Sequence, residues 1–431
     1  MRRAFLPLAV LLFLCGALPA QDAGTCSQRL RGHVGFFASD SLSGRLAGTS
    51  GERRAADYIY DRLYEAGLTM LADRSGQDFS IVKGGDTLHS ANIVGMVEGY
   101  DSALKGQYVV VGANMDHIGT NILTVDGGET IQVYPGANDN ASGLSCLIEL
   151  AERVAGTSFL FRRSVVFVAF GAKEEGMAGS WYFVNRAFSH TDSISVMVDL
   201  VSLGKSGESN PFIYYTCVPN PDVSGFVNRI AGAGSYYAPS HGEGTVLPND
   251  YLTFYEKGIP VVLFTTGSSR TNRTVRDIPS GLDYQNMEYI CEFVFNFIRE
   301  AANADYMVSR ISSEGEDPLD RVYTPYEVDN PPEFYHGDEK RFLERWVYTY
   351  LKYPEMPLSM GIQGQVLVEF IVEKDGSVSN VKAVRGDDYD LEDEAVRVVA
   401  ASPKWKPATL GGEKVRVKYV IPVEFRLRKR K

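Results

Sequence analysis

The chain has 431 residues, a formal net charge of −11, 44% apolar residues, five cysteines and six histidines. This length allows two or three domains with buried cores, and the composition excludes collagen-like, low-complexity and wholly disordered chains. The acidic balance argues against a general nucleic-acid binder, which needs a basic face to displace counterions from phosphates.

The first 20 residues have the three parts of a secretory signal peptide. Arg2 and Arg3 precede an apolar run, and Ala20 is a small residue at the cleavage position. The run is shorter than the ~20 apolar residues that span a bilayer, and no later stretch approaches that length. We therefore expect an exported chain with no transmembrane segment after cleavage, located in the periplasm or outer envelope of a Gram-negative bacterium.

Export also bears on the cysteines that remain after cleavage. Cys26, Cys146, Cys217 and Cys291 are scattered along the chain. This spacing favours buried small residues over a disulfide framework, although an oxidising compartment permits one bridge. The sequence does not say whether any pair is bonded.

A polar segment at 306–322 is typical of a linker and divides the chain. It predicts one domain at 21–305 and a second at 323–431. Acidic and basic residues are equal in number from Tyr323 onward, so the net negative charge belongs to the region before it.

The region before the linker alternates strand-like runs with helical periods. Short β-rich apolar runs predict strands at 108–111, 164–170, 194–200 and 261–264. Helical periodicity predicts helices at 51–66, 143–154, 178–188, 221–232 and 284–303. The alternation predicts an α/β domain with a mostly parallel central sheet and flanking helices. Ligand sites in such sheets lie beyond the carboxyl ends of the strands.

Acidic residues lie at or after the ends of several of these predicted strands. Asp116, Asp139, Glu174 and Asp199 all follow or end a predicted strand. Each alone is typical of a helix cap or a solvated loop. Together they indicate one edge lined with carboxylates, which is how hydrolytic metal sites are commonly built.

Several ordered blocks resemble the double-zinc aminopeptidase family, peptidase family M28. They include Asp40 to Arg45, Gly48-Thr49, the helix at 51–66 and Phe254 to Pro260. The family also contains glutaminyl cyclases and non-catalytic receptor relatives. The resemblance implies a site in which two zinc ions are held by a His, a bridging Asp, a Glu, a second Asp and a second His. A further Glu serves as general base.

The acids of that pattern are present in this chain. The resemblance places the bridging ligand at Asp139, the Glu ligand at Glu174 and the second Asp at Asp199. Asp116 occupies the position that orients the first His. These residues are the candidate metal ligands and their support, if a metal binds.

The remaining positions depart from the pattern. The two His positions hold Asn114 and Arg273, and the general-base position holds Lys173. An amide is a poor zinc ligand, a guanidinium has no usable lone pair, and a lysine is protonated at neutral pH. We therefore expect no cofactor and no confident catalytic residue, with Arg273 and Lys173 taking the place of the metals beside the three acids.

This prediction describes a pseudoenzyme that acts as a peptide-binding or scaffolding module through its former active-site cleft. The alternative is an active metallo-exopeptidase or cyclase with a rewired site, holding zinc or another divalent metal. His117 is the substitute imidazole in that case. A purely structural envelope module is a third hypothesis.

The region after the linker resembles the C-terminal domain of TonB-type energy transducers. The matching blocks are at 331–334, 351–354, 361–364, 375–376, 405–407 and 421–425. Strands are predicted at 365–373, 377–385 and 415–428, and helices at 338–351 and 391–401, which makes a small α+β domain. The resemblance implies docking to an outer-membrane receptor or another envelope protein, with Tyr353 and Pro354 as candidate binding residues.

Overall fold

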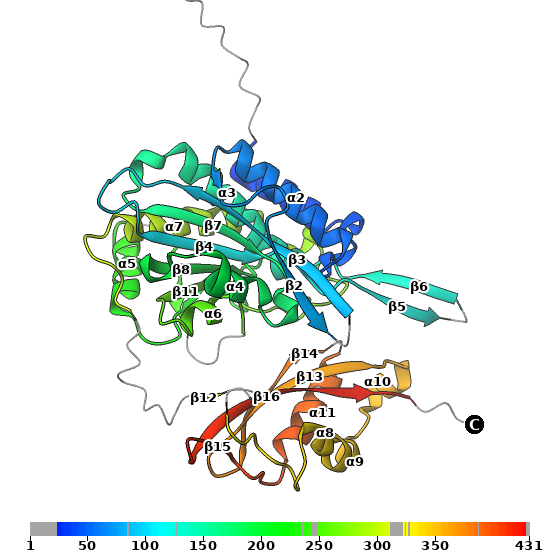
Figure 1. The fold of residues 1–431 in the computed structure, drawn as a ribbon. Coiled ribbons are helices and arrows are strands. Elements are labelled where there is room, and N and C mark those ends of the chain that lie inside the picture. The colour runs from blue at the N-terminus through cyan, green and yellow to red at the C-terminus, as the bar shows by residue number, and fades with distance from the viewer. Residues whose placement is uncertain are drawn as a thin grey trace, which may run out of the picture.

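The structure is a computed structural model that describes 24–83, 86–125, 128–234, 237–242, 248–310, 322–323, 325, 328–386 and 388–427. The predicted signal peptide, most of the predicted linker and the basic end of the chain lie outside these residues. Two bodies follow one another along the chain, as the colours of Figure 1 show.

The first body is built on a nine-stranded sheet in the order β1-β3-β7-β4-β8-β11-β9-β10, with β2 paired to β3. The central strands β7, β4, β8 and β11 are parallel, whereas β3 and β9, which flank them, run antiparallel to their central neighbours. The strands are β1 (Thr69–Met70), β2 (Gln77–Lys83), β3 (Asp86–Val97), β4 (Tyr108–Asn114), β7 (Ser164–Phe170), β8 (Ile194–Val201), β9 (Ile213–Tyr215), β10 (Ser240–His241) and β11 (Val261–Thr265).

Helices cover both faces of this sheet, so its central strands are buried on both sides. One face packs on α1 (Cys26–Phe37), α2 (Ser50–Glu65), α3 (Gly143–Gly156), α5 (Pro221–Gly232) and α7 (Tyr284–Asn303). The other face packs on η5 (Phe183–Ala187), which continues α4 (Ala178–Tyr182), and on α6 (Tyr251–Tyr255). Alternation along β4 shows the two layers, because Val109 and Val111 join the first core and Val110 joins the second. The predicted α/β architecture is confirmed.

Local sequence explains where the main helices begin. Thr25 caps α1 through its side chain, and Asp283 accepts the backbone N–H of Asn286 at the start of α7. Pro221 occupies the first turn of α5, where its missing N–H costs nothing. A separate hairpin, β5 (Thr120–Val125) with β6 (Gly128–Val133), projects from this body (Figure 1).

The second body is a five-stranded antiparallel-rich sheet in the order β12-β16-β13-β14, with β15 on β16. Its core lies between the sheet and α11, where Val366, Val368 and Phe370 meet Leu391 and Val398. The strands are β12 (Val322–Tyr323), β13 (Gly364–Val372), β14 (Val378–Arg385), β15 (Ala408–Leu410) and β16 (Glu413–Phe425). The helices are α8 (Glu339–Phe342), α9 (Tyr348–Tyr350), α10 (Glu355–Met360) and α11 (Tyr389–Ala400).

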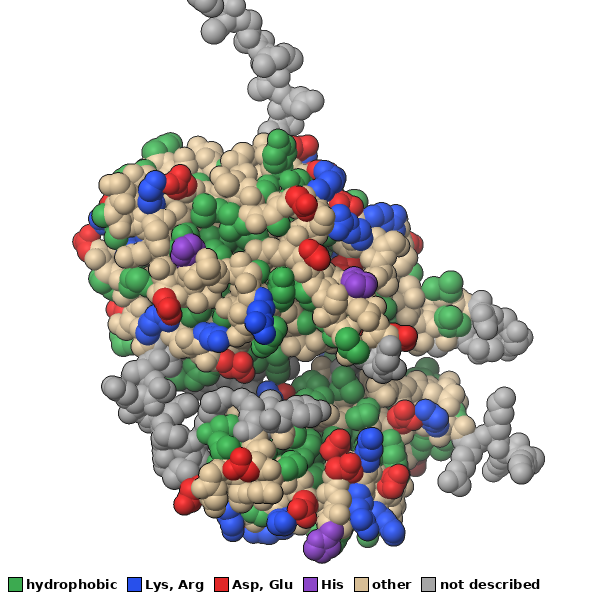
Figure 2. Space-filling view, in the orientation of Figure 1, with side chains coloured by type: hydrophobic (Ala, Val, Ile, Leu, Met, Phe, Trp, Pro, Cys, Tyr) green, Lys and Arg blue, Asp and Glu red, His purple; other side chains and the backbone are tan. Residues whose placement is uncertain are grey.

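Charged side chains of both signs are spread over the two bodies in Figure 2. The bodies share a pocket of about 520 Å³, lined by Thr120 and Tyr134 from the first and by Gln365 and Phe425 from the second. Within the described ranges, every helix is too short or too polar to cross a membrane.

Candidate functional site

The candidate site residues are carried by loops at the carboxyl edge of the parallel strands. Asn114 ends β4, and Asp199 lies near the end of the neighbouring strand β8. Asp139 belongs to the turn η2 (Ala137–Ser142), which leads into α3, and Glu174 belongs to the turn η4 (Lys173–Glu175), which follows β7. Arg273 lies in the loop after β11 and has a positive φ of 61°. The fold thus brings five separated segments to one edge.

Glu174 forms the central ion pair of this edge. Arg273 donates from Nη1 to Oε1 at 3.0 Å and from Nη2 to Oε2 at 2.8 Å. The Nζ atom of Lys173 lies 3.2 Å from Oε1 of the same carboxylate. Burial alone would raise the pKa of Glu174, but the charges of Lys173 and Arg273 outweigh it and hold that pKa well below its ordinary value.

The same balance fixes the charge of both cations. Burial would lower the pKa of Lys173, but the Glu174 and Asp139 carboxylates raise it above the usual lysine value. The pKa of Arg273 is also raised, because Glu174 and Asp139 outweigh the effect of burial. Lys173 and Arg273 are therefore cations throughout the neutral range, as the sequence predicts.

Asp139 is the second acid within reach of Arg273, with 3.9 Å between Nη1 and Oδ2. The carboxylate of Asp277 holds the η2 turn, which carries Asp139, in place. It accepts the backbone N–H groups of Asn138 at 2.8 Å and Asp139 at 3.0 Å. Burial raises the pKa of Asp277 to about 6, although these two hydrogen bonds act in the opposite direction. The peptide bond between Asp139 and Asn140 is cis.

Asn114 is held by amide hydrogen bonds. Its Nδ2 donates to the backbone oxygen of Asp116 at 3.1 Å, and its Oδ1 accepts from Asn140 Nδ2 at 3.0 Å. The carboxylate of Asp116 accepts the backbone N–H groups of Lys173 and Glu174, both at 2.9 Å. Asp116 therefore positions the η4 turn with its side chain, and reaches Asn114 only through its backbone.

Asp199 belongs to a second group of acids on the same edge. Its Oδ2 accepts from Asn249 Nδ2 at 2.9 Å and from the backbone N–H of Tyr251 at 3.1 Å, whereas its Oδ1 has no partner among the described residues. Neither oxygen of Asp250 has a hydrogen bond of ordinary geometry there, although the Ser180 hydroxyl acts to lower the Asp250 pKa. Burial first, and Asp250 second, raise the pKa of Asp199 to about 8.

The substitute imidazole considered from the sequence is fully enclosed. His117 is 1% exposed, and neither of its ring nitrogens has a hydrogen-bond partner in the described part of the chain. Burial lowers its pKa to about 3, while the nearby Asp139 acts in the opposite direction. His117 is therefore a neutral ring beside Asp139, with two nitrogens that no described residue satisfies.

Sequence reasoning did not identify three contributors to this edge. Two of them are Asp250 and Asp277, to which the sequence analysis gave no role. Arg45 is 0% exposed and donates to the backbone oxygens of Met115 at 3.0 Å, Pro135 at 2.8 Å and Gly136 at 3.1 Å. The signal available for Arg45 was its place in the block from Asp40 to Arg45, one of those that resemble peptidase family M28.

The candidate binding residues of the second body lie elsewhere. The Tyr353 hydroxyl donates to the backbone oxygen of Ile362, and its ring packs edge-on to Phe425 at 5.6 Å. Pro354 is the N-cap residue of α10. These contacts hold the segment before β13 in place, and the binding role of both residues stays a prediction.

Comparison with known proteins follows the two bodies. Residues 92–298 match the family model described as peptidase family M28, and residues 349–427 match the one described as Gram-negative bacterial TonB protein C-terminal. The alkaline phosphatase isozyme conversion protein of Escherichia coli is 26% identical over 284 residues, which cover 61% of this chain and 77% of that protein. Aminopeptidase YwaD of Bacillus subtilis is 27% identical over 149 residues, which cover 33% of this chain and 31% of that protein.

Solved structures show the same fold. A zinc aminopeptidase from Bacillus subtilis, BSAP, aligns with a TM-score of 0.53 and 15% identity over 66% of this chain and 97% of its own. LapB from Legionella pneumophila aligns with a TM-score of 0.52 and 18% identity over 64% of this chain and 72% of its own. Both resemblances stated from the sequence, to peptidase family M28 and to the TonB C-terminal domain, are therefore confirmed.

These matches correct one expectation. The prediction that no cofactor binds is wrong. The match to peptidase family M28 and the similarity to zinc aminopeptidases both point to zinc. The error came from treating replaced ligands as proof that the metal is lost. Zinc is the metal that the comparisons suggest.

The side chains at the positions to which the resemblance assigns the zinc ligands nevertheless do not fit a two-zinc arrangement. Asn114 is engaged by amide hydrogen bonds, Arg273 is a cation, and both oxygens of Glu174 are paired to Arg273. Within the part of the chain that the structure describes, no group of three or more His, Cys, Asp or Glu side chains is arranged to hold a metal. Among the described residues, the buried unpartnered side-chain atoms on this edge belong to His117, Asp199, Asn249, Asp250 and Arg273.

Proposed function

We propose that the chain is an exported protein of the Gram-negative envelope that binds peptide ends without hydrolysing them. Residues 1–20 would direct export, and 21–305 would form the peptide-binding unit. The linker at 306–322 would join it to a docking unit at 323–431. The match to the TonB C-terminal family supports the envelope location and a protein partner for that second unit.

One observation carries the loss of hydrolysis: a protonated lysine occupies the position of the general base. Peptide hydrolysis by a metal-activated water needs a neighbouring group that accepts the proton of the water. The charge of Lys173 is stabilised by Glu174, and Glu174 is itself paired to Arg273. General base catalysis is worth about 10²–10⁴-fold in rate.

The charges at the same edge support a peptide-end ligand. A free peptide amino group is a cation for part of the neutral range, with an ordinary pKa near 7.7–8. Asp139 has the most exposed side chain of the candidate acids, at 12%, and its distance to Arg273 exceeds that of a hydrogen bond. We therefore assign Asp139 as the acceptor of the ligand's amino group.

The second candidate function is that of an active zinc-dependent exopeptidase or cyclase with a rearranged site. It is favoured by the two unpartnered ring nitrogens of His117 beside Asp139, within the described part of the chain. Imidazole and carboxylate are ligands that zinc prefers. His117 and Asp139 would then supply two ligands, and a third would have to be brought in by rearrangement, because no three such side chains of the described residues are arranged to hold a metal.

One set of measurements separates the two candidates. The purified mature chain is incubated with aminoacyl reporter substrates and peptides in zinc, in manganese and in a chelator, and its metal content is measured by elemental analysis. The leading proposal predicts no turnover above buffer under any of these conditions, with peptide binding by calorimetry that Asp139→Ala abolishes. Zinc-dependent turnover that Asp139→Ala abolishes would establish the second candidate.

The docking role has its own test. Immobilised full-length chain is presented with periplasmic plug segments of outer-membrane receptors, and retention is compared for wild type, Tyr353→Ala and Tyr353→Phe. Tyr353→Phe keeps the ring contact with Phe425 but loses the hydroxyl that donates to Ile362. Retention by wild type that is reduced in Tyr353→Ala supports docking through this segment, and equal background retention by all three contradicts it.

A further inference from the structure

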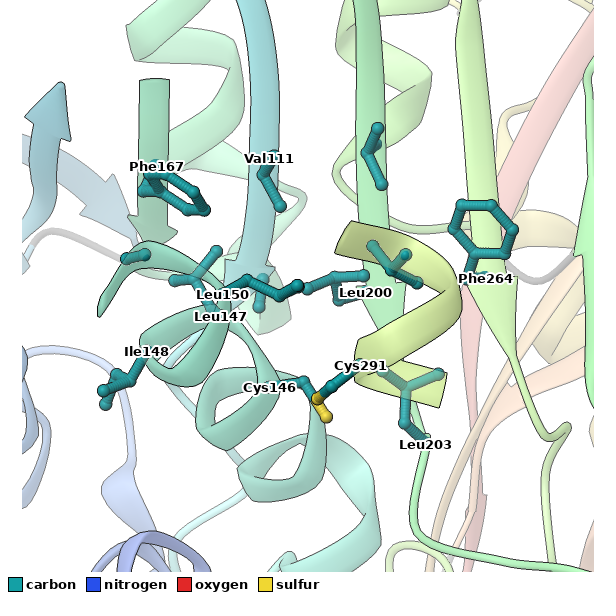
Figure 3. Close-up of a cluster of buried hydrophobic side chains, with 14 of the residues drawn as sticks. Val111, Cys146, Leu147, Ile148, Leu150, Phe167, Leu200, Leu203, Phe264 and Cys291 are labelled. Atoms are coloured by element: carbon teal, nitrogen blue, oxygen red, sulfur yellow. The ribbon is translucent and has the colours of Figure 1, made fainter. Parts of the chain in front are cut away.

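Three cysteines from distant parts of the sequence lie together in the core of the first body. Cys26 begins α1, Cys146 lies in α3 and Cys291 lies in α7. The thiols of Cys146 and Cys291 are within hydrogen-bonding contact, and Figure 3 shows their sulfur atoms side by side between the two helices. All three are free thiols in the structure. Cys217 lies apart from these three, near Tyr251 in the core on the opposite face of the sheet.

We propose that Cys146 and Cys291 are a disulfide site that joins α3 to α7 in the exported protein. The reaction is thiol–disulfide exchange with an oxidised dithiol protein or a small disulfide such as oxidised glutathione. The two thiols lose two protons and two electrons as the S–S bond forms, and the oxidant's disulfide is reduced to two thiols. The compartment of this reaction rests on the proposed export, because disulfides persist in oxidising compartments.

Contact and burial select this pair over Cys26 with Cys291. Cys146 is 0% exposed and Cys291 is 4% exposed, whereas Cys26 is half-buried. Cys26 and Cys291 both line a pocket of about 630 Å³, which leaves space beside them. The Cys291 thiol has a direct side-chain contact with Cys146, whereas no such contact joins it to Cys26 among the described residues.

Burial also sets when the bond can form. Contact with Cys146 and burial raise the pKa of the Cys291 thiol well above its ordinary value, so the folded protein has very little thiolate to react. Apolar side chains that include Leu147 and Leu150 of α3 surround the pair on the side of the core (Figure 3), and Glu149 and Arg153 lie on the side of the pocket. The bond therefore forms while the chain folds, before α3 and α7 close over it, and it then resists reductants.

Peptide mapping tests the assignment. The full chain is exported into a bacterial periplasm, purified without reductant, denatured in an alkylating reagent and digested. We expect Cys26 and Cys217 to be alkylated and Cys146 to be found linked to Cys291. After reduction under denaturing conditions, all four should be alkylated. Alkylation of all four without reduction, or a link from Cys26 to Cys291, would overturn the proposal.

Refolding separates this result from the question of export. Denatured, reduced chain is refolded in a mixture of oxidised and reduced glutathione and mapped in the same way, so that the bond can form wherever the protein resides in the cell. Cys291→Ser should leave Cys146 alkylated, and the matched Cys217→Ser should keep the linked pair. If Cys291→Ser does not fold, the mapping of the wild-type chain still decides the assignment.

Discussion

Arg273 donates to both carboxylate oxygens of Glu174, at 3.0 and 2.8 Å, from a loop that follows a different strand. This bidentate pair spans the carboxyl edge of the central sheet. A zinc aminopeptidase is among the proteins of similar fold. Its side chains are 19% and 7% exposed, so the charges depend on each other for solvation. The pair therefore has consequences for stability that can be measured without any substrate.

Loss of Arg273 should destabilise the first body. In Arg273→Met, Glu174 keeps only Lys173 as a cation, and removing one partner of a buried pair costs about 3 kcal/mol. Arg273→Lys should cost less, because it keeps the charge but loses the two-pronged geometry. Chemical denaturation measures both, with Arg276→Met as the matched control, since Arg276 is exposed in the same loop. Equal stability of Arg273→Met and the control would contradict this assignment.

The pair of acids Asp199 and Asp250 should make the folded protein less stable as the pH rises. Burial raises their pKa values to about 8 and about 6, from an ordinary value near 4. The folded state therefore binds more protons than the unfolded state between about pH 4 and pH 8, and this stability is lost as pH rises through that window. Lys173 moderates the effect, because its charge lowers both pKa values.

The variant Asp250→Asn should flatten that dependence. The substitution removes one of two carboxylates that repel each other. The free energy of unfolding of the variant, relative to wild type, should therefore increase by on the order of 2 kcal/mol between about pH 5 and pH 8. Denaturation is measured in a chelator, so that protons rather than metal ions compensate the charge. Asp192→Asn is the control, because Asp192 is exposed. A variant whose pH profile parallels that of wild type would show that the two acids do not interact.

The sequence predicted the central sheet because its strands are continuous apolar runs, such as 164–170, bounded by turns. It predicted the helix at 221–232 with the bounds that the structure has. It missed α1, where Gly32 and Gly35 dilute the helical pattern. It also missed the flanking strands β2 and β3, whose outer parts are exposed and lack a long apolar run.

The candidate site was predictable in its acids but not in its supporting contacts. Positions 139, 174 and 199 could be named because acids gather near the strand ends and because the resemblance to peptidase family M28 assigns a ligand position to each. The role of Asp277 could not be named, because it depends on its carboxylate meeting two N–H groups of a turn that is 138 and 139 residues away in sequence. Asp250 was missed for a similar reason: its effect on Asp199 arises only when α6 packs beside β8.

Arg45 should be more sensitive to substitution than any surface arginine. Arg45→Met would leave the backbone oxygens of Met115, Pro135 and Gly136 without their donor in a dry environment. Each buried unsatisfied acceptor costs about 1–3 kcal/mol, so the total loss should be about 4 kcal/mol or more. Thermal or chemical denaturation measures it, with Arg54→Met as control, because Arg54 is an exposed residue of α2. A loss below about 1 kcal/mol would show that water replaces the guanidinium.

Introducing the side chains that the resemblance to peptidase family M28 implies should produce hydrolytic activity, if their replacement explains its loss. The triple variant Asn114→His, Lys173→Glu and Arg273→His replaces an amide and two cations with two imidazoles and a carboxylate, the groups that bind zinc and accept a proton. With zinc, we expect turnover of an aminoacyl reporter at least about 100-fold above wild type, the lower range of a general base. The double variant Asn114→His and Arg273→His, which keeps the native Lys173, should bind zinc in elemental analysis but lack the gain in rate. If that double variant is as active as the triple, the absence of the base does not explain the lack of hydrolysis, and the second candidate function is favoured.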